Sequence, residues 1–237
     1  MDKPQERVVF FDVGGTLMRD DPPVPVVFTA VANRLGYDVS LADVEAVVPA
    51  AYEFYDAQYL RDGDFWCAHE RAVQLWLDMY AIIARHCGIN AGVPELSQAV
   101  YDEYLKPECW SLFPDAEECL KRLVKGGFRL AVVSNWDATL ESLLRKMGVL
   151  PYFDEVVASA AVGCRKPSSA IFEIALERMG VDPANAWHVG DLPEADGDGA
   201  SGAGISPVII DRKGIIDETC VYPRITTLAD LPAYLGL

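Results

Sequence analysis

Polar residues recur directly after short apolar runs in this sequence. Asp12 follows Val8-Val9-Phe10-Phe11, Ser134 follows the apolar end of 128–133, and Asp191 follows the short strand pattern Trp187-His188-Val189 and Gly190. Such runs are typical of strands buried on both faces of a parallel sheet. The carboxyl ends of these strands lie at one edge of an open α/β sheet, where ligands bind. The sequence therefore predicts that residues far apart in the chain meet in one site.

The residue types at these positions suit a metal ion and an anionic ligand. Two carboxylates, Asp12 and Asp191, match a hard divalent cation such as Mg²⁺. The hydroxyl of Ser134 and the ammonium of Lys166 can donate to phosphate oxygens. Each residue also has an ordinary structural interpretation: Ser134 or Asp191 could cap a helix, and Lys166 could be a loop charge. The coincidence of all four favours a site for a metal and a phosphorylated ligand.

Strand and helix patterns alternate through most of the chain, which predicts an α/β fold with a doubly wound, mainly parallel sheet. Residues 18–106 differ, because after a polar loop at 19–23 they show only helical patterns. We expect residues 1–17 and 107–237 to form the α/β core and 18–106 an inserted helical domain. The predicted helices of the insertion are 26–35, 41–60, 65–86 and 93–105. The predicted elements after it are helices at 114–125, 138–147, 170–179 and 228–235, and strands at 128–133, 154–161, 187–189 and 207–211.

Composition narrows the class of partner. The 237 residues are 51% hydrophobic and carry a formal net charge of −16, which disfavours a nucleic-acid or anionic-membrane surface. No apolar run reaches the roughly 18 residues of a membrane span. The polar start of the chain predicts no signal peptide, and six irregularly spaced cysteines are typical of reduced thiols. We expect a cytoplasmic protein, monomeric or homodimeric, that acts on a small phosphorylated metabolite.

Four segments resemble, in order, the motifs of the haloacid dehalogenase superfamily. They are Asp12–Leu17, Val132–Asn135, Arg165–Pro167 and Gly190–Asp196. The sequences around Ser134 and Asp191 are most similar to the haloacid dehalogenase-like hydrolase branch related to the REG-2 proteins. The resemblance implies a Rossmann-like core, a mobile helical cap inserted after the first motif, and phosphoryl transfer.

The resemblance also implies roles for individual residues. Asp12 would be the nucleophile that forms an aspartyl-phosphate, with Ser134 and Lys166 as the other catalytic groups. The phosphoryl oxygens would be bound by Ser134, Asn135, Lys166 and Gly15. Mg²⁺ would lie between Asp12, the backbone carbonyl of Gly14, and Asp191, with Asp196 as a ligand or in the second shell.

Gly14 departs from the superfamily's pattern, because its phosphatases usually carry an acid/base Asp at that position. Such a group typically raises the reaction rate 10²–10⁴-fold, so we expect slow turnover of alkyl phosphates. Two alternatives follow. The chain could be a catalytically impaired protein that binds a phosphorylated ligand or a partner, or it could be a 2-haloacid dehalogenase, although Asp191 would then repel the anionic substrate.

Substrate choice would depend on the cap, where the sequence is less informative. Candidate substrate-facing residues there are Tyr55, Tyr59, Arg61, Trp66 and His69. Core packing accounts for most aromatic residues at helical spacing, so we expect the aromatic members of this set to pack inside the cap.

Overall fold

The computed structural model describes residues 6–237; residues 1–5, on which the expected absence of a signal peptide partly depends, lie outside the described residues. The chain forms two compact units. One contains the chain up to Arg19 together with Leu112–Leu237, and the other is Asp20–Ser111. The boundaries expected from the sequence, after residues 17 and 106, fall close to these. The role of the second unit as a mobile cap stays a prediction.

The α/β unit is built on a six-stranded sheet, which confirms the predicted fold class. Its strands lie in the order β5-β4-β1-β6-β7-β8, and each neighbouring pair is parallel. Their bounds are Arg7–Phe11 (β1), Phe128–Ser134 (β4), Glu155–Ala158 (β5), Ala186–Gly190 (β6), Ser206–Ile210 (β7) and Arg224–Ile225 (β8).

The central strand β1 is the point at which the strand order reverses. The chain passes from β1 to β4 and β5 on one side, then returns to β6, β7 and β8 on the other. Val8 to Phe11 are fully buried, as expected for a strand covered on both faces. The carboxyl ends of β4, β1 and β6 are therefore adjacent, at the switch point where open α/β sheets bind ligands.

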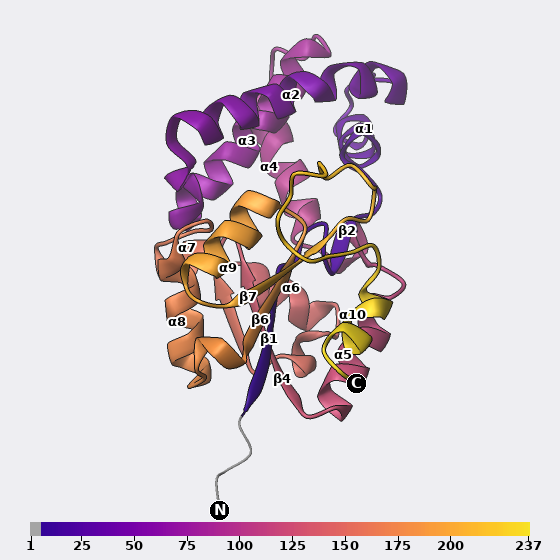
Figure 1. Cartoon of the computed structure of the whole chain (residues 1–237). Helices are drawn as coiled ribbons and strands as arrows, with labels where there is room; N and C mark the ends of the chain where they lie inside the picture. Colours follow the sequence, from indigo (N-terminus) through magenta and orange to yellow (C-terminus); the bar gives the residue numbers. More distant parts are fainter. Residues whose placement is uncertain (1–5) are drawn as a thin grey trace, which may run out of the picture. The chain divides into compact units, whose positions relative to one another are not determined.

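Helices cover both faces of this sheet (Figure 1), with α8 and α9 on one face and α5 and α10 on the other. Val8 and Phe10 of β1 pack with Phe172 of α8, whereas Phe11 contacts Phe153 edge-on. The helices of this unit are α5 (Ala116–Lys125), α6 (Leu140–Lys146), α7 (Ser159–Val162), α8 (Ser169–Met179), α9 (Gly199–Gly202) and α10 (Leu231–Tyr234), with short helical turns η3 (Leu150–Tyr152), η4 (Pro183–Asn185), η5 (Pro193–Asp198) and η6 (Leu228–Asp230).

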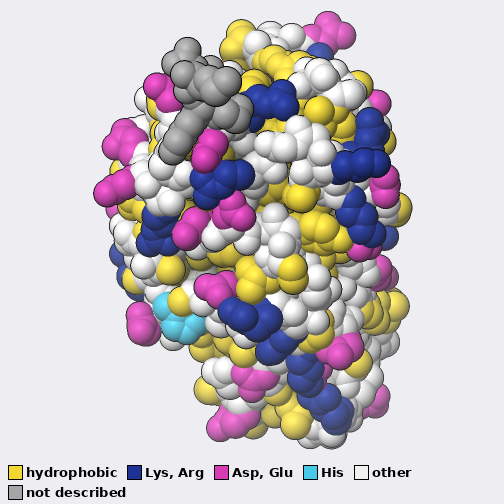
Figure 2. Space-filling view, turned by 90° about the horizontal axis from the view of Figure 1, so that it is seen from below, with side chains coloured by type: hydrophobic (Ala, Val, Ile, Leu, Met, Phe, Trp, Pro, Cys, Tyr) yellow, Lys and Arg dark blue, Asp and Glu magenta, His cyan; other side chains and the backbone are white. Residues whose placement is uncertain are grey.

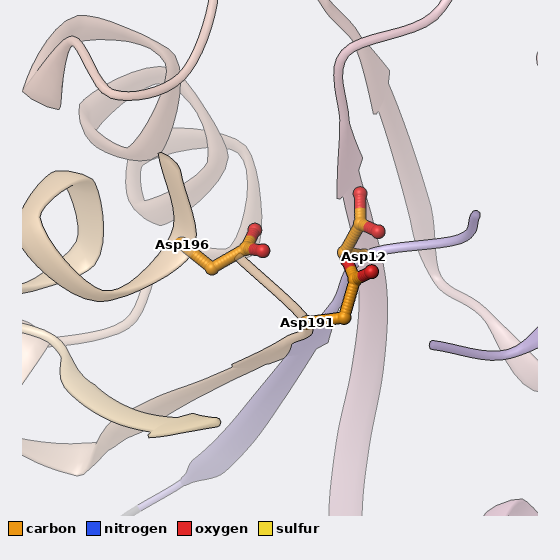
Figure 3. Close-up of side chains that lie close together, drawn as sticks. All are labelled: Asp12, Asp191 and Asp196. Atoms are coloured by element: carbon orange, nitrogen blue, oxygen red, sulfur yellow. The ribbon is translucent and has the colours of Figure 1, made fainter. Parts of the chain in front are cut away.

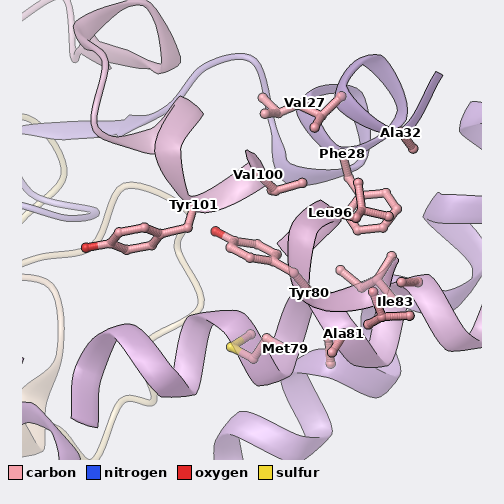
Figure 4. Close-up of a cluster of buried hydrophobic side chains, with 14 of the residues drawn as sticks. Val27, Phe28, Ala32, Met79, Tyr80, Ala81, Ile83, Leu96, Val100 and Tyr101 are labelled. Atoms are coloured by element: carbon pink, nitrogen blue, oxygen red, sulfur yellow. The ribbon is translucent and has the colours of Figure 1, made fainter. Parts of the chain in front are cut away.

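The second unit is helical, as predicted. Its elements are α1 (Val24–Arg34), α2 (Leu41–Asp62), η1 (Gly63–Cys67), α3 (His69–His86), α4 (Val93–Tyr104) and η2 (Pro107–Cys109). Side chains of α1, α3 and α4 meet in its core (Figure 4). Tyr55, Tyr59 and Trp66 pack against or within this core, and the Trp66 indole donates to the Tyr55 hydroxyl at 3.2 Å. The expectation that the aromatic residues pack inside the unit is confirmed for these three.

Two local predictions need correction, and three short strands were not predicted. The strand predicted at 154–161 ends at Ala158, and Ser159–Val162 turn into α7, because the Ser159 hydroxyl exchanges hydrogen bonds with the backbone of Trp136. The predicted loop at 19–23 begins in strand β2 (Met18–Asp20), which pairs with β3 (Trp110–Leu112). Strand β8 was also not predicted. The three missed strands are two or three residues long and have no periodicity to detect.

The surface carries charges of both signs. On the face shown in Figure 2, Lys and Arg side chains are interspersed with Asp and Glu, despite the net charge of −16. Within residues 6–237, no helix combines the length and apolar character needed to cross a bilayer.

Candidate active site

Three carboxylates converge at the carboxyl edge of the sheet. Asp12 directly follows β1 and Asp191 directly follows β6, while Asp196 lies on η5, a turn of π-helix. One oxygen from each lies within 4.8 Å of the others. Figure 3 shows the Asp196 carboxylate pointing toward the other two. The two aspartates predicted from strand ends are thus neighbours, although 179 positions apart in the sequence.

Lys166 places its ammonium between two of these carboxylates. Its Nζ lies 2.6 Å from Asp12 Oδ1 and 2.5 Å from Asp196 Oδ1, and the side chain is 3% exposed. Burial alone would lower the pKa of Lys166, but the negative charges of Asp12 and Asp196 outweigh it and raise that pKa. The lysine therefore stays charged at neutral pH.

The two oxygens of Asp12 have different surroundings. Oδ1 accepts hydrogen bonds from the Ser134 hydroxyl at 2.9 Å and from Lys166. Oδ2 accepts only a 3.5 Å contact from the Thr16 hydroxyl among the described residues, a length at which a hydrogen bond is weak. Asp12 is therefore held in place through Oδ1, which leaves lone pairs of Oδ2 for a ligand.

Asn135 fixes the backbone of Lys166. Its Oδ1 accepts from the Lys166 backbone N–H at 2.8 Å, and its Nδ2 donates to the Lys166 carbonyl at 3.1 Å. Both ends of the amide group are used in this pair. Since Asn135 follows Ser134 directly, the pair ties the two donors of Asp12 Oδ1 to each other. The role in phosphate binding expected for Asn135 stays a prediction.

Asp196 is fully enclosed by donors. Besides Lys166, its Oδ1 contacts His188 Nε2 at 2.9 Å, and its Oδ2 accepts from the backbone N–H of Leu192 at 2.9 Å. Burial would raise the pKa of Asp196, but Lys166 and His188 hold it below its usual value. Burial lowers the pKa of His188, so the imidazole is neutral and donates from Nε2.

Asp191 is partly buried and is repelled by the neighbouring carboxylates. Burial, and then the charges of Asp12 and Asp196, raise its pKa to about 7. One ammonium does not balance three carboxylates, so a further positive charge would stabilise the group. Hard carboxylate oxygens are the ligands that Mg²⁺ and Ca²⁺ prefer. The donor set therefore fits a divalent cation, as the sequence predicted.

Two glycines leave room for the carboxylates. A Cβ on Gly15, which has φ +73°, would lie 2.2 Å from Asp191 Oδ2. A Cβ on Gly190 would lie 2.0 Å from Asp196 Cγ. Gly14 is different, since a Cβ there would make only an ordinary 3.7 Å contact with the Trp136 ring. Side chains are thus excluded at Gly15 and Gly190 but not at Gly14.

Comparison with known proteins agrees with this geometry. A family model described as haloacid dehalogenase-like hydrolase matches residues 6–204. The chain belongs to this family. This confirms the family that the sequence resemblance implied, and the parallel sheet agrees with the fold that it implied.

Three similar proteins illustrate the range of the family. Haloacid dehalogenase-like hydrolase domain-containing protein 3 of Mus musculus is 34% identical over 220 residues, which cover 90% of this chain and 85% of that protein. Ribulose-1,5-bisphosphate 5-phosphatase of Halopiger xanaduensis is 32% identical over 233 residues, 92% and 90% of the two chains. The crystal structure of 2-haloacid dehalogenase from Pseudomonas syringae pv. Tomato aligns with a TM-score of 0.67 and 25% identity, covering 98% and 99%.

The structure brings together most of the predicted residues of this hydrolase site. Asp12, Ser134, Lys166, Asp191 and Asp196 form one connected group. Gly14 and Gly15 lie in the turn after Asp12, and Gly15 faces Asp191. Whether the Gly14 carbonyl binds a metal, and whether Gly15 binds phosphate, stay predictions.

Sequence reasoning missed two neighbours of the group, Thr16 and His188. His188 is completely buried within β6 and packs edge-on against Phe172. A polar residue inside an otherwise apolar strand was the available signal, because buried polar groups need partners.

Replacing Gly15 with alanine should abolish cation binding. The new Cβ would collide with the Asp191 carboxylate, and the positive φ adds about 1–2 kcal/mol of backbone strain. Gly148→Ala is the matched control, since Gly148 has φ +76° and open space around it. Both variants should lose stability in urea, Gly15→Ala more because of the collision, but only Gly15→Ala should lose Mg²⁺ binding in calorimetric titration. Equal Mg²⁺ affinity in the two variants would contradict the geometry.

Replacing Asn135 with alanine should free the backbone of Lys166 and cost about 1–3 kcal/mol of unfolding free energy. Asn33 offers a control, because it makes the same reciprocal pair with the backbone of Val39. Asn135→Ala should weaken binding of inorganic phosphate in the presence of Mg²⁺ by roughly tenfold, whereas Asn33→Ala should not. Unchanged phosphate affinity in Asn135→Ala would show that the pair serves stability alone.

Proposed function

We propose that the protein is a Mg²⁺-dependent phosphohydrolase that acts on small phosphate monoesters through an aspartyl-phosphate on Asp12. One observation carries the proposal: one oxygen from each of Asp12, Asp191 and Asp196 lies within 4.8 Å of the others, beside a buried Lys166 that pairs with Asp12 and Asp196. The similarity to a ribulose-1,5-bisphosphate 5-phosphatase over most of both chains supports it.

The contacts of each residue indicate its role in this reaction. Asp12 and Asp191 offer oxygens to the cation, and the Gly14 carbonyl is the further ligand expected at this turn. Asp196 has both oxygens engaged by donors, so we assign it to holding Lys166 and not to direct ligation. Bound Mg²⁺ would offset the negative charge of substrate and carboxylates. Lys166 and Ser134 would donate to the oxygens of the transferring phosphoryl group.

The reaction has two steps. A carboxylate oxygen of Asp12 forms a bond to phosphorus while the bond between phosphorus and the ester oxygen breaks, and the leaving group departs with that electron pair. Water then attacks the phosphorus of the acyl phosphate, which releases inorganic phosphate and restores the Asp12 carboxylate. Protons for the leaving group and from the water exchange with solvent, since Gly14 offers no acid/base group.

The dehalogenase alternative is disfavoured by charge. A 2-haloacid is an anion, and in the absence of a cation it would enter a group in which three carboxylates face one ammonium. Repulsion of this kind opposes both the binding of the anionic substrate and the ionisation of the Asp12 nucleophile. Because a solved dehalogenase is similar to this chain, the alternative should be tested directly by measuring halide release from 2-chloropropionate.

Wild-type protein should release phosphate from p-nitrophenyl phosphate and acetyl phosphate with Mg²⁺, and EDTA should abolish the activity. Asp12→Asn should lower the rate by roughly 10³-fold or more, because the nucleophile is lost. A colorimetric phosphate assay measures both. Metal-dependent phosphate binding with no turnover would identify the impaired binding protein instead, and halide release without phosphate release would identify the dehalogenase.

Gly14→Asp should raise turnover of an alkyl phosphate such as ribulose-1,5-bisphosphate more than that of p-nitrophenyl phosphate. A Cβ at this position would make only an ordinary contact with the Trp136 ring, and an added acid/base group typically speeds reaction of a poor leaving group 10²–10⁴-fold. Comparing kcat for the two substrates in wild type and variant measures the effect. A variant whose kcat for the alkyl phosphate is no higher than that of wild type would refute the explanation based on a missing proton donor.

A further inference from the structure

Arg212, two residues beyond the end of β7, connects the turn after Asp12 to the start of α5. Its Nη2 donates to the Thr16 carbonyl at 2.7 Å and to Asp115 Oδ1 at 3.0 Å, and its Nη1 donates to Asp115 Oδ2 at 3.0 Å. The guanidinium lies 3.8 Å from the centroid of the Phe113 ring. Bidentate pairing and stacking on an aromatic face are contacts that a guanidinium makes and an ammonium does not.

The partner carboxylate is itself held in place. Asp115 Oδ2 also accepts from the Thr227 hydroxyl at 2.6 Å and from the backbone N–H of Leu228 at 2.8 Å. Burial would raise the pKa of Asp115, but the hydrogen bonds from Arg212, Thr227 and Leu228 lower it overall. Both side chains of the ion pair are 15% exposed. Asp115 is thus ionised at neutral pH, and the ion pair is attached both to the turn at Thr16 and to residues 227–228.

The Thr16 carbonyl belongs to the tight turn that carries the proposed nucleophile. Within this turn the N–H groups of Leu17 and Met18 donate to the Val13 carbonyl, and that of Gly15 donates to the Met18 carbonyl. The Thr16 side chain is completely buried and its hydroxyl is directed at Asp12. A displacement of the Thr16 peptide would therefore move groups on both sides of it, including Gly15, against which Asp191 lies.

We propose that Arg212 is a positioning residue for the reaction. By holding the Thr16 carbonyl against the fixed Asp115 carboxylate, it keeps Asp12 aligned for attack and Gly15 clear of Asp191. The role in catalysis rests on the proposed function, whereas the effect on the turn does not. Arg212 acts through Thr16, since it has no contact with the three carboxylates of the site among the described residues.

Arg212→Lys tests the proposal, because it keeps the positive charge but loses the bidentate pair. We expect kcat for p-nitrophenyl phosphate to fall roughly 10–100-fold, as small misplacements at a reacting centre do, with KM changed less than threefold. Amide hydrogen exchange of a peptide covering residues 12–18 should become faster, since the Thr16 peptide is released.

Arg129→Lys is the matched control. Arg129 lies near the amino-terminal end of β4 and makes ion pairs with Glu6 and Asp154 and a hydrogen bond to the Met179 carbonyl. Its replacement removes a comparable set of contacts from the opposite edge of the sheet. It should lower the thermal midpoint without changing kcat or exchange at residues 12–18.

The proposal is overturned if Arg212→Lys loses stability like the control while its kcat and its exchange at residues 12–18 match wild type. If Arg212→Lys does not fold, Asp115→Asn provides the same readouts, because it weakens the bidentate pair from the other side.

Hydrogen exchange separates this proposal from the proposed function. A wild-type protein that hydrolyses no phosphate ester refutes the phosphohydrolase, but faster exchange at 12–18 in Arg212→Lys would still establish the anchoring of the turn.

Discussion

The contact between the Lys166 ammonium and two buried carboxylates is the interaction on which the site depends. Asp12 and Asp196 are 6% and 1% exposed, and carboxylates so deeply buried are costly unless they are paired. Lys166 supplies the pairing for both at once, at 2.6 and 2.5 Å. The third carboxylate, Asp191, has no such partner in this group, and burial together with the charges of Asp12 and Asp196 raises its pKa. The lysine thus makes the group compatible with folding, while the remaining charge makes it a site for a cation.

The fold could be predicted from the sequence because its signals are local. Four consecutive apolar residues before Asp12 and similar runs before Ser134 and Asp191 gave the central strands, and alternation with helical patterns gave the parallel sheet. Strand β2 depends instead on a partner about 90 positions away, which no local pattern reveals. The turn at Ser159 depends likewise on hydrogen bonds to Trp136 across the fold.

The candidate site was predictable to the same extent. Residues at the ends of apolar runs could be found because topology alone brings strand ends together. Thr16 and Arg212 could not, since each acts by a contact that only the folded chain defines. His188 was signalled only as a polar residue in an apolar strand, and its partner Asp196 was not. Asn135 shows the limit most clearly. The family resemblance implies a role in phosphate binding, which stays a prediction, but it gave no sign that both ends of the amide bind the backbone of Lys166.

That reciprocal pair has a consequence for the energetics of ligand binding. Ser134 ends strand β4 and Lys166 lies in the loop before α8, yet covalent linkage and two hydrogen bonds through Asn135 hold the two residues together. The two donors therefore lose their rotational freedom when the chain folds and not when a ligand binds. Preorganisation of this kind lets a larger share of the contact energy appear as affinity for whatever anion the donors receive.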